Sequence, residues 1–264
     1  MDYINLSWID LLLSLSLILL ALGLARWQKI DIQRDVTIGT IRTFVQLLAV
    51  GYVLKWLFNL EHWLPLFAVL AIMIAFASWE GTKRPEFPVP RLYSILYLSI
   101  LVSAGITLLL TIGFIIPVDP WWRPNYFLPL AGILIGNALN GAALTADRLS
   151  AEIRGRRLQI EASLALGAST FEAIGHSLRA SVKAALIPSI NSLMTVGVVH
   201  LPGIMVGQIL AGTPPVQAIR YQIVIMYMLI STKAIGSIVT GMLVYRQFFT
   251  GRHQLRTGLL TGGE

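Results

Sequence analysis

The chain has 264 residues, of which 56% are hydrophobic and only 12% are charged, and it contains no cysteine. An ordinary soluble domain is about 25% charged, so this composition excludes a typical soluble protein, and the lack of cysteine excludes disulfides and thiolate metal sites. The formal net charge of +7 does not indicate nucleic-acid binding, because the basic residues lie in loops between apolar segments, where they set membrane topology. We predict an all-α, polytopic transmembrane protein that is embedded in the lipid bilayer and does not bind nucleic acid.

Seven apolar segments follow in chain order, and each approaches the roughly 20 residues that a helix needs to cross a bilayer. We predict spans at residues 8–25, 36–57, 63–79, 92–116, 126–146, 184–210 and 221–245, packed as a single permease domain over residues 1–264. The sixth segment contains Pro188, Gly197 and Pro202, and proline bends a helix. We therefore expect one bent span there, with a re-entrant turn near residues 197–203 as the alternative.

The basic residues predict the orientation of the chain. Most of the 20 lysines and arginines follow spans one, three, five and seven, whereas the opposite loops hold only Lys55, Arg123 and Arg220. Loops rich in Lys and Arg remain in the cytosol. We predict an inner (plasma) membrane protein whose N-terminus lies outside and whose C-terminus lies in the cytosol.

The loop after the fifth span, about residues 149–183, carries a helix–break–helix pattern. Gly167 can take the left-handed conformation that closes a helix, and Ser169 with Glu172 forms a capping box that starts the next one. An apolar stripe continues along that second helix at Phe171, Ile174, Leu178 and Val182. The pattern predicts a protruding cytosolic turn, which either docks a soluble partner or lies on the membrane surface as an ordinary amphipathic connector.

Two resemblances favour docking. Glu161-Ala162-Ser163-x-x-x-Gly167 resembles the EAA loop of ABC-importer permeases, whose coupling helix sits in a cleft of the ATPase. Most of the chain is similar to the Fet-type (FetB-like) permeases, which are bacterial iron exporters with plant relatives linked to aluminium tolerance. That likeness lies at residues 42–47, 136–145, 161–168, 185–197, 201–212 and 220–223.

The resemblance implies an ABC exporter in which this chain pairs with a separate cytosolic ATPase. The ATPase-coupling residues would be Glu161, Ala162, Leu166, Gly167, Ala168, Ser169 and Glu172. The chain has no Gly-x-x-x-x-Gly-Lys-Ser/Thr phosphate loop, so we expect no enzymatic activity and no bound cofactor of its own, with ATP and magnesium on the partner. The small-residue pairs Gly132–Gly136 and Gly203–Gly207 allow close helix packing, within one chain or across a homodimer.

Polar residues inside the spans are candidates for a substrate path. They are Asn137, Asn140, Asn191, Met194, His200, Met205, Gln208 and Lys233. Imidazole and thioether groups bind transition metals, so His200, Met194 and Met205 are candidate metal ligands, although such residues more often serve in helix packing. A charge at mid-membrane depth, such as Lys233, is a functional candidate by default, and it would repel a metal cation.

Iron export driven by a partner ATPase is therefore the leading prediction. An ABC permease for an anionic or nucleotide-sugar substrate is the first alternative, supported by Lys233 and by the plant relatives. The second is a secondary carrier without a motor, which the lack of a mid-span carboxylate argues against. A membrane scaffold without transport is the third.

Overall fold

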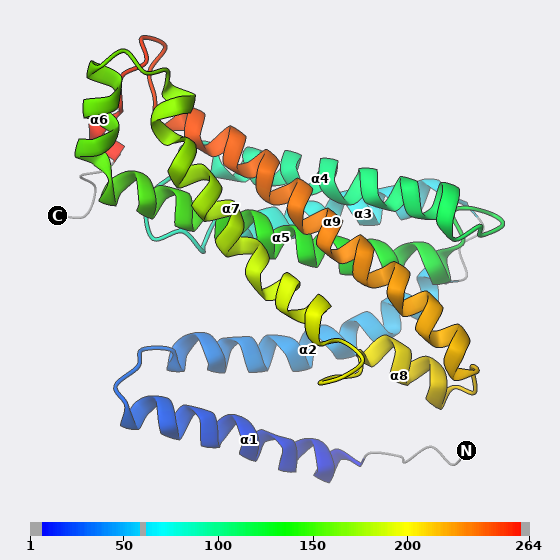
Figure 1. Cartoon of the computed structure of the whole chain (residues 1–264). Coiled ribbons are helices and arrows are strands. Elements are labelled where there is room, and N and C mark those ends of the chain that lie inside the picture. Colours follow the sequence, from blue (N-terminus) through cyan, green and yellow to red (C-terminus); the bar gives the residue numbers. More distant parts are fainter. Residues whose placement is uncertain (1–6, 59–61, 260–264) are drawn as a thin grey trace. The chain divides into compact units, whose positions relative to one another are not determined.

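The computed structural model describes residues 7–58 and 62–259, and every regular element in these ranges is helical. The chain divides into two compact units, residues 1–61 and residues 62–264. Figure 1 shows the helices of both units, coloured along the chain. The all-α prediction is confirmed for the part of the chain that the structure describes.

The first unit is a helical hairpin made of α1 (Trp8–Trp27) and α2 (Gln33–Leu57). The side chain of Ser7 caps α1 and forms a capping box with Asp10. Lys29, with φ of 56°, lies in the turn between the two helices. Nearly all side chains of both helices are exposed within the unit, and most of them are apolar. Such a surface is suited to lipid or to other apolar helices rather than to water.

The second unit is a bundle in which five long helices pack together: α3 (Leu64–Gly81), α4 (Leu92–Leu110), α5 (Pro124–Gly155), α7 (Thr170–Thr195) and α9 (Pro215–Gln247). A π-helical segment, η1 (Thr111–Ile115), extends α4. The short helices are α6 (Arg157–Ala165), α8 (Gly203–Leu210) and a 3-10 turn, η2 (Thr257–Leu259). Helices α5 and α9 run in the same direction, and α7 runs against them (Figure 1).

Glycines allow the central helices to approach closely. A Cβ atom on Gly141 of α5 would lie 2.6 Å from Cγ of Lys233 and 3.1 Å from its backbone oxygen, both on α9. A Cβ on Gly241 of α9 would lie 2.6 Å from a methyl carbon of Leu178 on α7. Contacts this short leave no room for a side chain, so α9 is held between α5 and α7 at these two points.

The structure has six helices, among the described residues, that are long and apolar enough to cross a membrane. They are Trp8–Trp27, Gln33–Lys55, Leu64–Gly81, Leu92–Ile115, Pro124–Gly155 and Pro215–Gln247. These match six of the seven predicted spans. Helix α5 continues beyond the predicted end of its span at residue 146 to Gly155, because no helix-breaking residue intervenes.

The predicted sixth span, residues 184–210, is not one helix. Helix α7 begins at Thr170, well before the apolar run, and ends at Thr195. The chain then turns at Gly197, whose φ of 83° suits only glycine without strain, and Pro202 starts the short helix α8. Together α7 and α8 carry the chain from the α6 end of the bundle to the start of α9. The prediction of seven crossings therefore requires that α7 and α8 count as one interrupted crossing.

The two predicted small-residue pairs do not make the closest helix contacts. Cβ atoms added at Gly136, Gly203 and Gly207 would meet no heavy atom within 4 Å. Only Gly132 has a near neighbour, the terminal carbon of Met73 at 3.4 Å. Packing inside the described chain therefore uses other glycines, and these three positions leave a small-residue surface open.

Candidate functional site

A protruding segment at one end of the second unit contains the predicted coupling residues. Helix α6 ends in a Schellman motif: the amide of Gly167 donates to the carbonyl of Leu164 at 3.0 Å, and the amide of Ala168 donates to the carbonyl of Ser163 at 3.1 Å. Gly167 has φ of 92°. The helix ending predicted at Gly167 is confirmed.

The start of α7 is fixed just as firmly. Ser169 is the N-cap, and its hydroxyl accepts a hydrogen bond from the amide of Glu172. In return the Glu172 carboxylate accepts from the amide of Ser169 at 2.8 Å and from its hydroxyl at 2.7 Å. These hydrogen bonds, the side-chain one first, lower the pKa of the Glu172 carboxyl. The predicted capping box is confirmed, and few residues separate two helices whose ends are both defined.

Helix α6 carries two apolar stripes on different faces. Ile160 is 2% exposed and packs in the core with Leu164. Leu158 and Leu166, by contrast, are 79% and 89% exposed. These two leucines are spaced i and i+8 around the exposed Ala162, so the three lie on one helical face. We call Leu158, Ala162 and Leu166 the outer stripe. It has no partner in the described chain.

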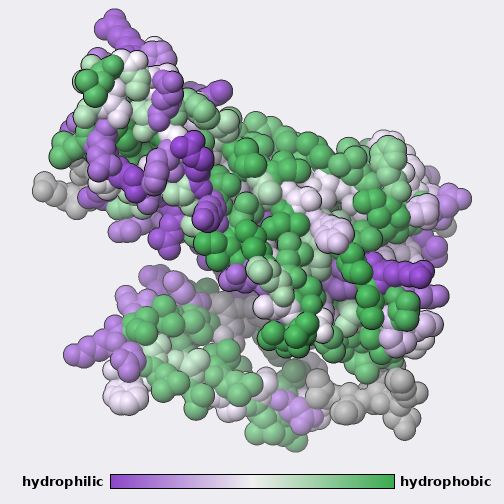
Figure 2. Space-filling view, in the orientation of Figure 1, coloured by the Kyte–Doolittle hydropathy of each residue, from purple (hydrophilic) through white to green (hydrophobic). Residues whose placement is uncertain are grey.

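Leu158 was not among the predicted site residues. The signal was present in the sequence, since Leu158, Ala162 and Leu166 follow one another at intervals of four. Figure 2 shows that hydrophilic residues surround this end of the second unit, at α6 and the start of α7. Exposed leucines in such a polar region indicate a protein contact rather than a lipid contact.

The segment after α9 folds back to support α6. Phe249 and Leu255 form an isolated antiparallel bridge, and the amide of Thr250 donates to the carbonyl of Gln254 at 2.8 Å. We call residues 248–255 the C-terminal hairpin. Phe248 is fully buried. The core that joins the hairpin to α5, α6 and α7 includes Phe248, Phe249, Leu255, Leu149, Ile153, Ile160 and Ile174.

The C-terminal hairpin and α6 enclose an open notch of about 410 Å³. Leu164, Ala165, Ala168 and Glu161 line one side, and Arg252, His253, Gln254 and Leu255 line the other. Glu161 is already paired within α6, because it accepts a hydrogen bond from Nε of Arg157 at 2.9 Å. The notch thus presents two basic side chains beside a carboxylate whose charge is compensated. The predicted coupling residues lie on α6, in the turn that follows it and, for Glu172, in the first turn of α7.

A polar cavity of about 280 Å³ lies between α5, α7, α8 and α9. Asn137, Ser189, Ser192, His200 and Gln222 supply its polar side chains. His200 and Pro202, from the irregular backbone between α7 and α8, line it. Nδ1 of His200 lies 3.4 Å from the Thr195 hydroxyl, and the His200 carbonyl accepts a hydrogen bond from the amide of Gly197. Non-helical backbone within a membrane occurs where it faces a cavity or other protein.

Gln222 was missing from the predicted path. It is 5% exposed, and its side-chain oxygen has no hydrogen-bond partner. A buried amide oxygen without a partner costs about 1–3 kcal/mol, so a ligand or water in the cavity would stabilise it. The sequence gives no sign of it, because Gln222 lies next to the predicted outer end of its span, where a polar residue is ordinary.

The other predicted path residues are dispersed. Asn140 and Asn191 are exposed, Gln208 lies half-buried on α8, and Met194 is 79% exposed while Met205 is 7% exposed. Of the predicted metal ligands, only His200 lines the polar cavity. Within the described ranges no group of three His, Cys, Asp or Glu residues is arranged to hold a metal ion.

Lys233 lies on α9 near this cavity and is buried, at 7% exposure. It packs against Gly141, one helical turn from Asn137 along α5. No hydrogen bond or ion pair joins its ammonium group to another described residue. Such a charge requires either water or an anion in its vicinity.

Comparison with known proteins gives whole-length matches. A model of an uncharacterised protein family, UPF0014, matches residues 8–249. The chain is 36% identical to a UPF0014 membrane protein of Synechocystis, covering 96% of this chain and 97% of the relative. It is 35% identical to the probable iron export permease protein FetB of Escherichia coli, covering 95% of each. It is 33% identical to ALUMINUM SENSITIVE 3 of Arabidopsis thaliana, covering 92% of this chain and 88% of the relative. No solved structure matches.

Proposed function

The chain belongs to the UPF0014 family of membrane proteins, and from that premise we propose that it is the permease subunit of an ATP-driven ABC exporter. It is a multi-pass protein of the inner (plasma) membrane. In this proposal the α6 end faces the cytosol, a separate ABC ATPase binds there, and ATP and magnesium bind to that ATPase. The permease itself catalyses no reaction.

The observation that carries this proposal is the outer stripe. Burial of a leucine side chain contributes about 1.5–3 kcal/mol, so Leu158 and Leu166 together supply much of the affinity that a stable docking contact needs. The stripe lies among hydrophilic residues (Figure 2), where a membrane would not cover it. A hydrophobic cleft on a soluble partner is therefore its natural complement.

The same segment is suited to transmit motion. The Schellman motif and the capping box leave little freedom between α6 and α7, so a displacement of α6 is passed to α7. Helix α7 in turn contributes Ser189 and Ser192 to the polar cavity. Movement at the docking site would thus change the cavity directly. Interrupted helices at the membrane midplane are a common site for substrates in transporters.

The proposed substrate is a metal ion, iron in the first instance. Support comes from the printed name of the Escherichia coli relative, a probable iron export permease, and from the polar cavity, where His200 offers an imidazole and Asn137 and Gln222 offer amide oxygens. Neutral ligands of this kind bind a cation weakly, which suits release. The polar cavity includes no carboxylate.

A specific observation favours a second candidate, an anionic substrate such as a nucleotide sugar. Lys233 is buried close to the polar cavity and is without an ion-pair partner among the described residues. A fixed cation attracts anions and raises the energy of a metal ion passing near it. Lys233→Met should then abolish anion transport, whereas it should leave iron transport intact or increase it.

We also propose that two permease chains form a homodimer. An ABC transporter needs two membrane halves, and Gly136, Gly203 and Gly207 have open space around them. A second copy could approach closely at these positions. Gly207→Leu, whose Cβ atom would meet no other atom of the chain within 4 Å, should reduce dimer formation in detergent if this surface is used.

The decisive experiment reconstitutes the chain and its ABC ATPase in inverted vesicles and measures uptake of labelled iron. Uptake should require ATP, and Leu166→Asp should abolish both uptake and stable ATPase binding. Ala151→Asp is the matched control, because Ala151 is also exposed at this end of the second unit but lies on α5, away from the outer stripe. Iron uptake without ATP would instead indicate a secondary carrier, and an unaffected Leu166→Asp variant would refute docking through the outer stripe.

A further inference from the structure

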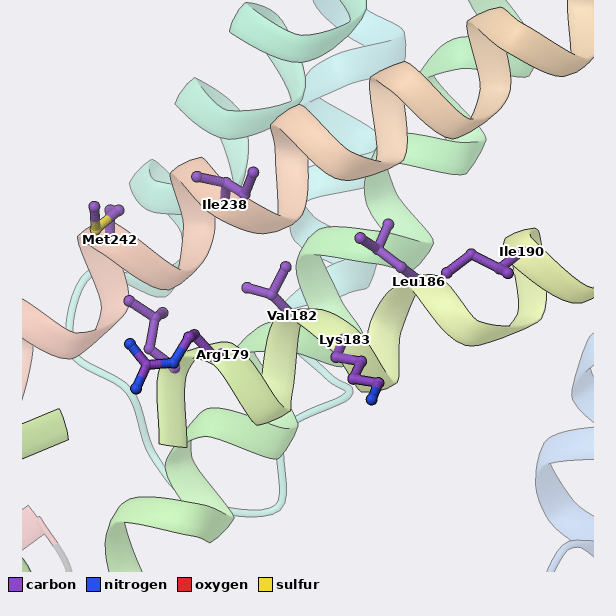
Figure 3. Close-up of a pocket in the computed structure, with 8 residues that line it drawn as sticks. Arg179, Val182, Lys183, Leu186, Ile190, Ile238 and Met242 are labelled. Atoms are coloured by element: carbon purple, nitrogen blue, oxygen red, sulfur yellow. The ribbon is translucent and has the colours of Figure 1, made fainter. Parts of the chain in front are cut away.

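An apolar groove of about 360 Å³ runs between α7 and α9 near the α6 end (Figure 3). Six of the residues that line it are apolar: Leu178, Val182, Leu186 and Ile190 from α7, and Ile238 and Met242 from α9. Ile190 and Ile238 are 41% and 50% exposed. The groove therefore opens onto the lipid-facing surface of the second unit instead of closing inside the bundle.

The remaining two lining residues are basic. Arg179 and Lys183 are four residues apart on α7, so they lie on the same side of the helix. In Figure 3 Val182 extends toward α9, whereas Lys183 extends away from it, so the ammonium group lies at the rim. The guanidinium of Arg179 approaches the Cβ position of Gly175 to 3.4 Å, which places it toward the α6 end.

Both charges are available to a ligand. Arg179 and Lys183 are exposed, and within the described chain neither makes an ion pair. Long basic side chains at a membrane boundary place their stems on apolar surface and their charges at the headgroup level. Here Arg179 lies toward the α6 end of the groove and Lys183 lies farther along its rim, and both stand beside walls that are apolar (Figure 3).

We propose that this groove binds an anionic phospholipid, with an acyl chain between α7 and α9 and the phosphate at Arg179 and Lys183. Basic pockets between transmembrane helices bind anionic headgroups in this way. A free phosphate would leave the apolar walls of the groove uncovered, whereas an acyl chain would cover them. Because α7 follows the coupling turn, the bound lipid would be positioned to brace α7 against α9.

The test is a lipid titration of the purified, delipidated chain, followed by native mass spectrometry. Phosphatidylglycerol should bind more tightly than phosphatidylcholine with the same acyl chains. Arg179→Gln with Lys183→Gln should weaken phosphatidylglycerol about thirtyfold, since each basic residue contributes roughly fivefold. Arg84→Gln with Arg148→Gln, which removes the same charge from exposed positions outside the groove, should change it less than about twofold.

A second variant tests the groove itself. Ile238→Trp fills the groove from its exposed rim and keeps both charges, so it should weaken phosphatidylglycerol at least about fivefold through lost acyl contact. An equal loss in both charge-removal pairs, or no loss in Ile238→Trp, would mean that lipid binds by general charge attraction, and either result overturns the proposal. Displacement of the bound phosphatidylglycerol by inorganic phosphate at matched ionic strength would also overturn the proposal. A dimer that dissociates in the Arg179/Lys183 variant without any lipid preference would identify the groove as a protein interface instead.

Discussion

Substitution of Gly167 tests whether one left-handed residue sets the junction between α6 and α7. A Cβ on Gly167 would meet nothing within 4 Å, so alanine is opposed only by the backbone φ of 92°. That conformation costs an L-residue about 1–2 kcal/mol, which reduces the population of the native turn roughly 5- to 30-fold relative to its alternatives. Proline is excluded more strongly, because its φ is fixed near −65° and it lacks the amide that donates to Leu164.

The expected order of effect is therefore asparagine, then alanine, then proline, since asparagine tolerates the left-handed region best. Two measurements check it. Hydrogen exchange of the last amides of α6 should rise in that order. In vesicles that contain the proposed partner ATPase, the amount of ATP hydrolysed per ion transported should rise in the same order. Gly155→Ala is the matched control, because Gly155 also has open space around it but has no positive φ.

Wild-type exchange and coupling in Gly167→Pro would refute the reasoning, because the turn would then not depend on its conformation. An equally large effect from Gly155→Ala would also contradict it, since the cause would then be a general loss of glycine near α6.

Three further predictions concern stability. The hydrogen bonds from Ser169 lower the pKa of Glu172, so their contribution to α7 is complete above the pKa of an unfolded glutamate and is lost as the pH falls through the lower folded value. The protection of the first amides of α7, measured as exchange relative to the intrinsic rate at each pH, should therefore fall in acid, and Ser169→Ala, at a cost of about 1 kcal/mol, should lower it already at neutral pH. A flat pH profile would contradict this. Gly141→Ala should lower the thermal unfolding midpoint through overpacking of about 1–3 kcal/mol, whereas Gly105→Ala, at an open position of α4, should not lower it. Phe248→Ala should lower the free energy of unfolding by about 3–5 kcal/mol and make the C-terminal hairpin sensitive to proteases. Unchanged protease sensitivity would mean that the buried ring of Phe248 does not hold the hairpin in place.

The features that the sequence predicted correctly are governed by local rules. The capping box at Ser169 and the helix end at Gly167 depend on residues within three positions of each other, and six spans depend on uninterrupted apolar runs. Such features need no knowledge of the neighbouring helices.

The features that the sequence did not predict depend on tertiary contacts. Helix α7 runs without a break from the capping box through Arg179 and Lys183 into the apolar run that begins at Ala184, and hydropathy gave no sign that the polar helix and the apolar run form one helix. The C-terminal hairpin has no strand-like alternation, and its turn uses His253 at a φ of 59°, which is uncommon for a residue other than glycine. Its position is determined by the burial of Phe248.

The C-terminal hairpin also has a consequence for biogenesis. During translation α6 leaves the ribosome long before residues 248–255, whose Phe248 and Phe249 pack in the same core as Ile160 of α6. Until α9 has been inserted and the C-terminal hairpin has folded, α6, which carries the outer stripe, lacks this packing. In the proposed complex, binding of the ATPase to the outer stripe should therefore follow insertion of α9, so that an incomplete permease would not engage it.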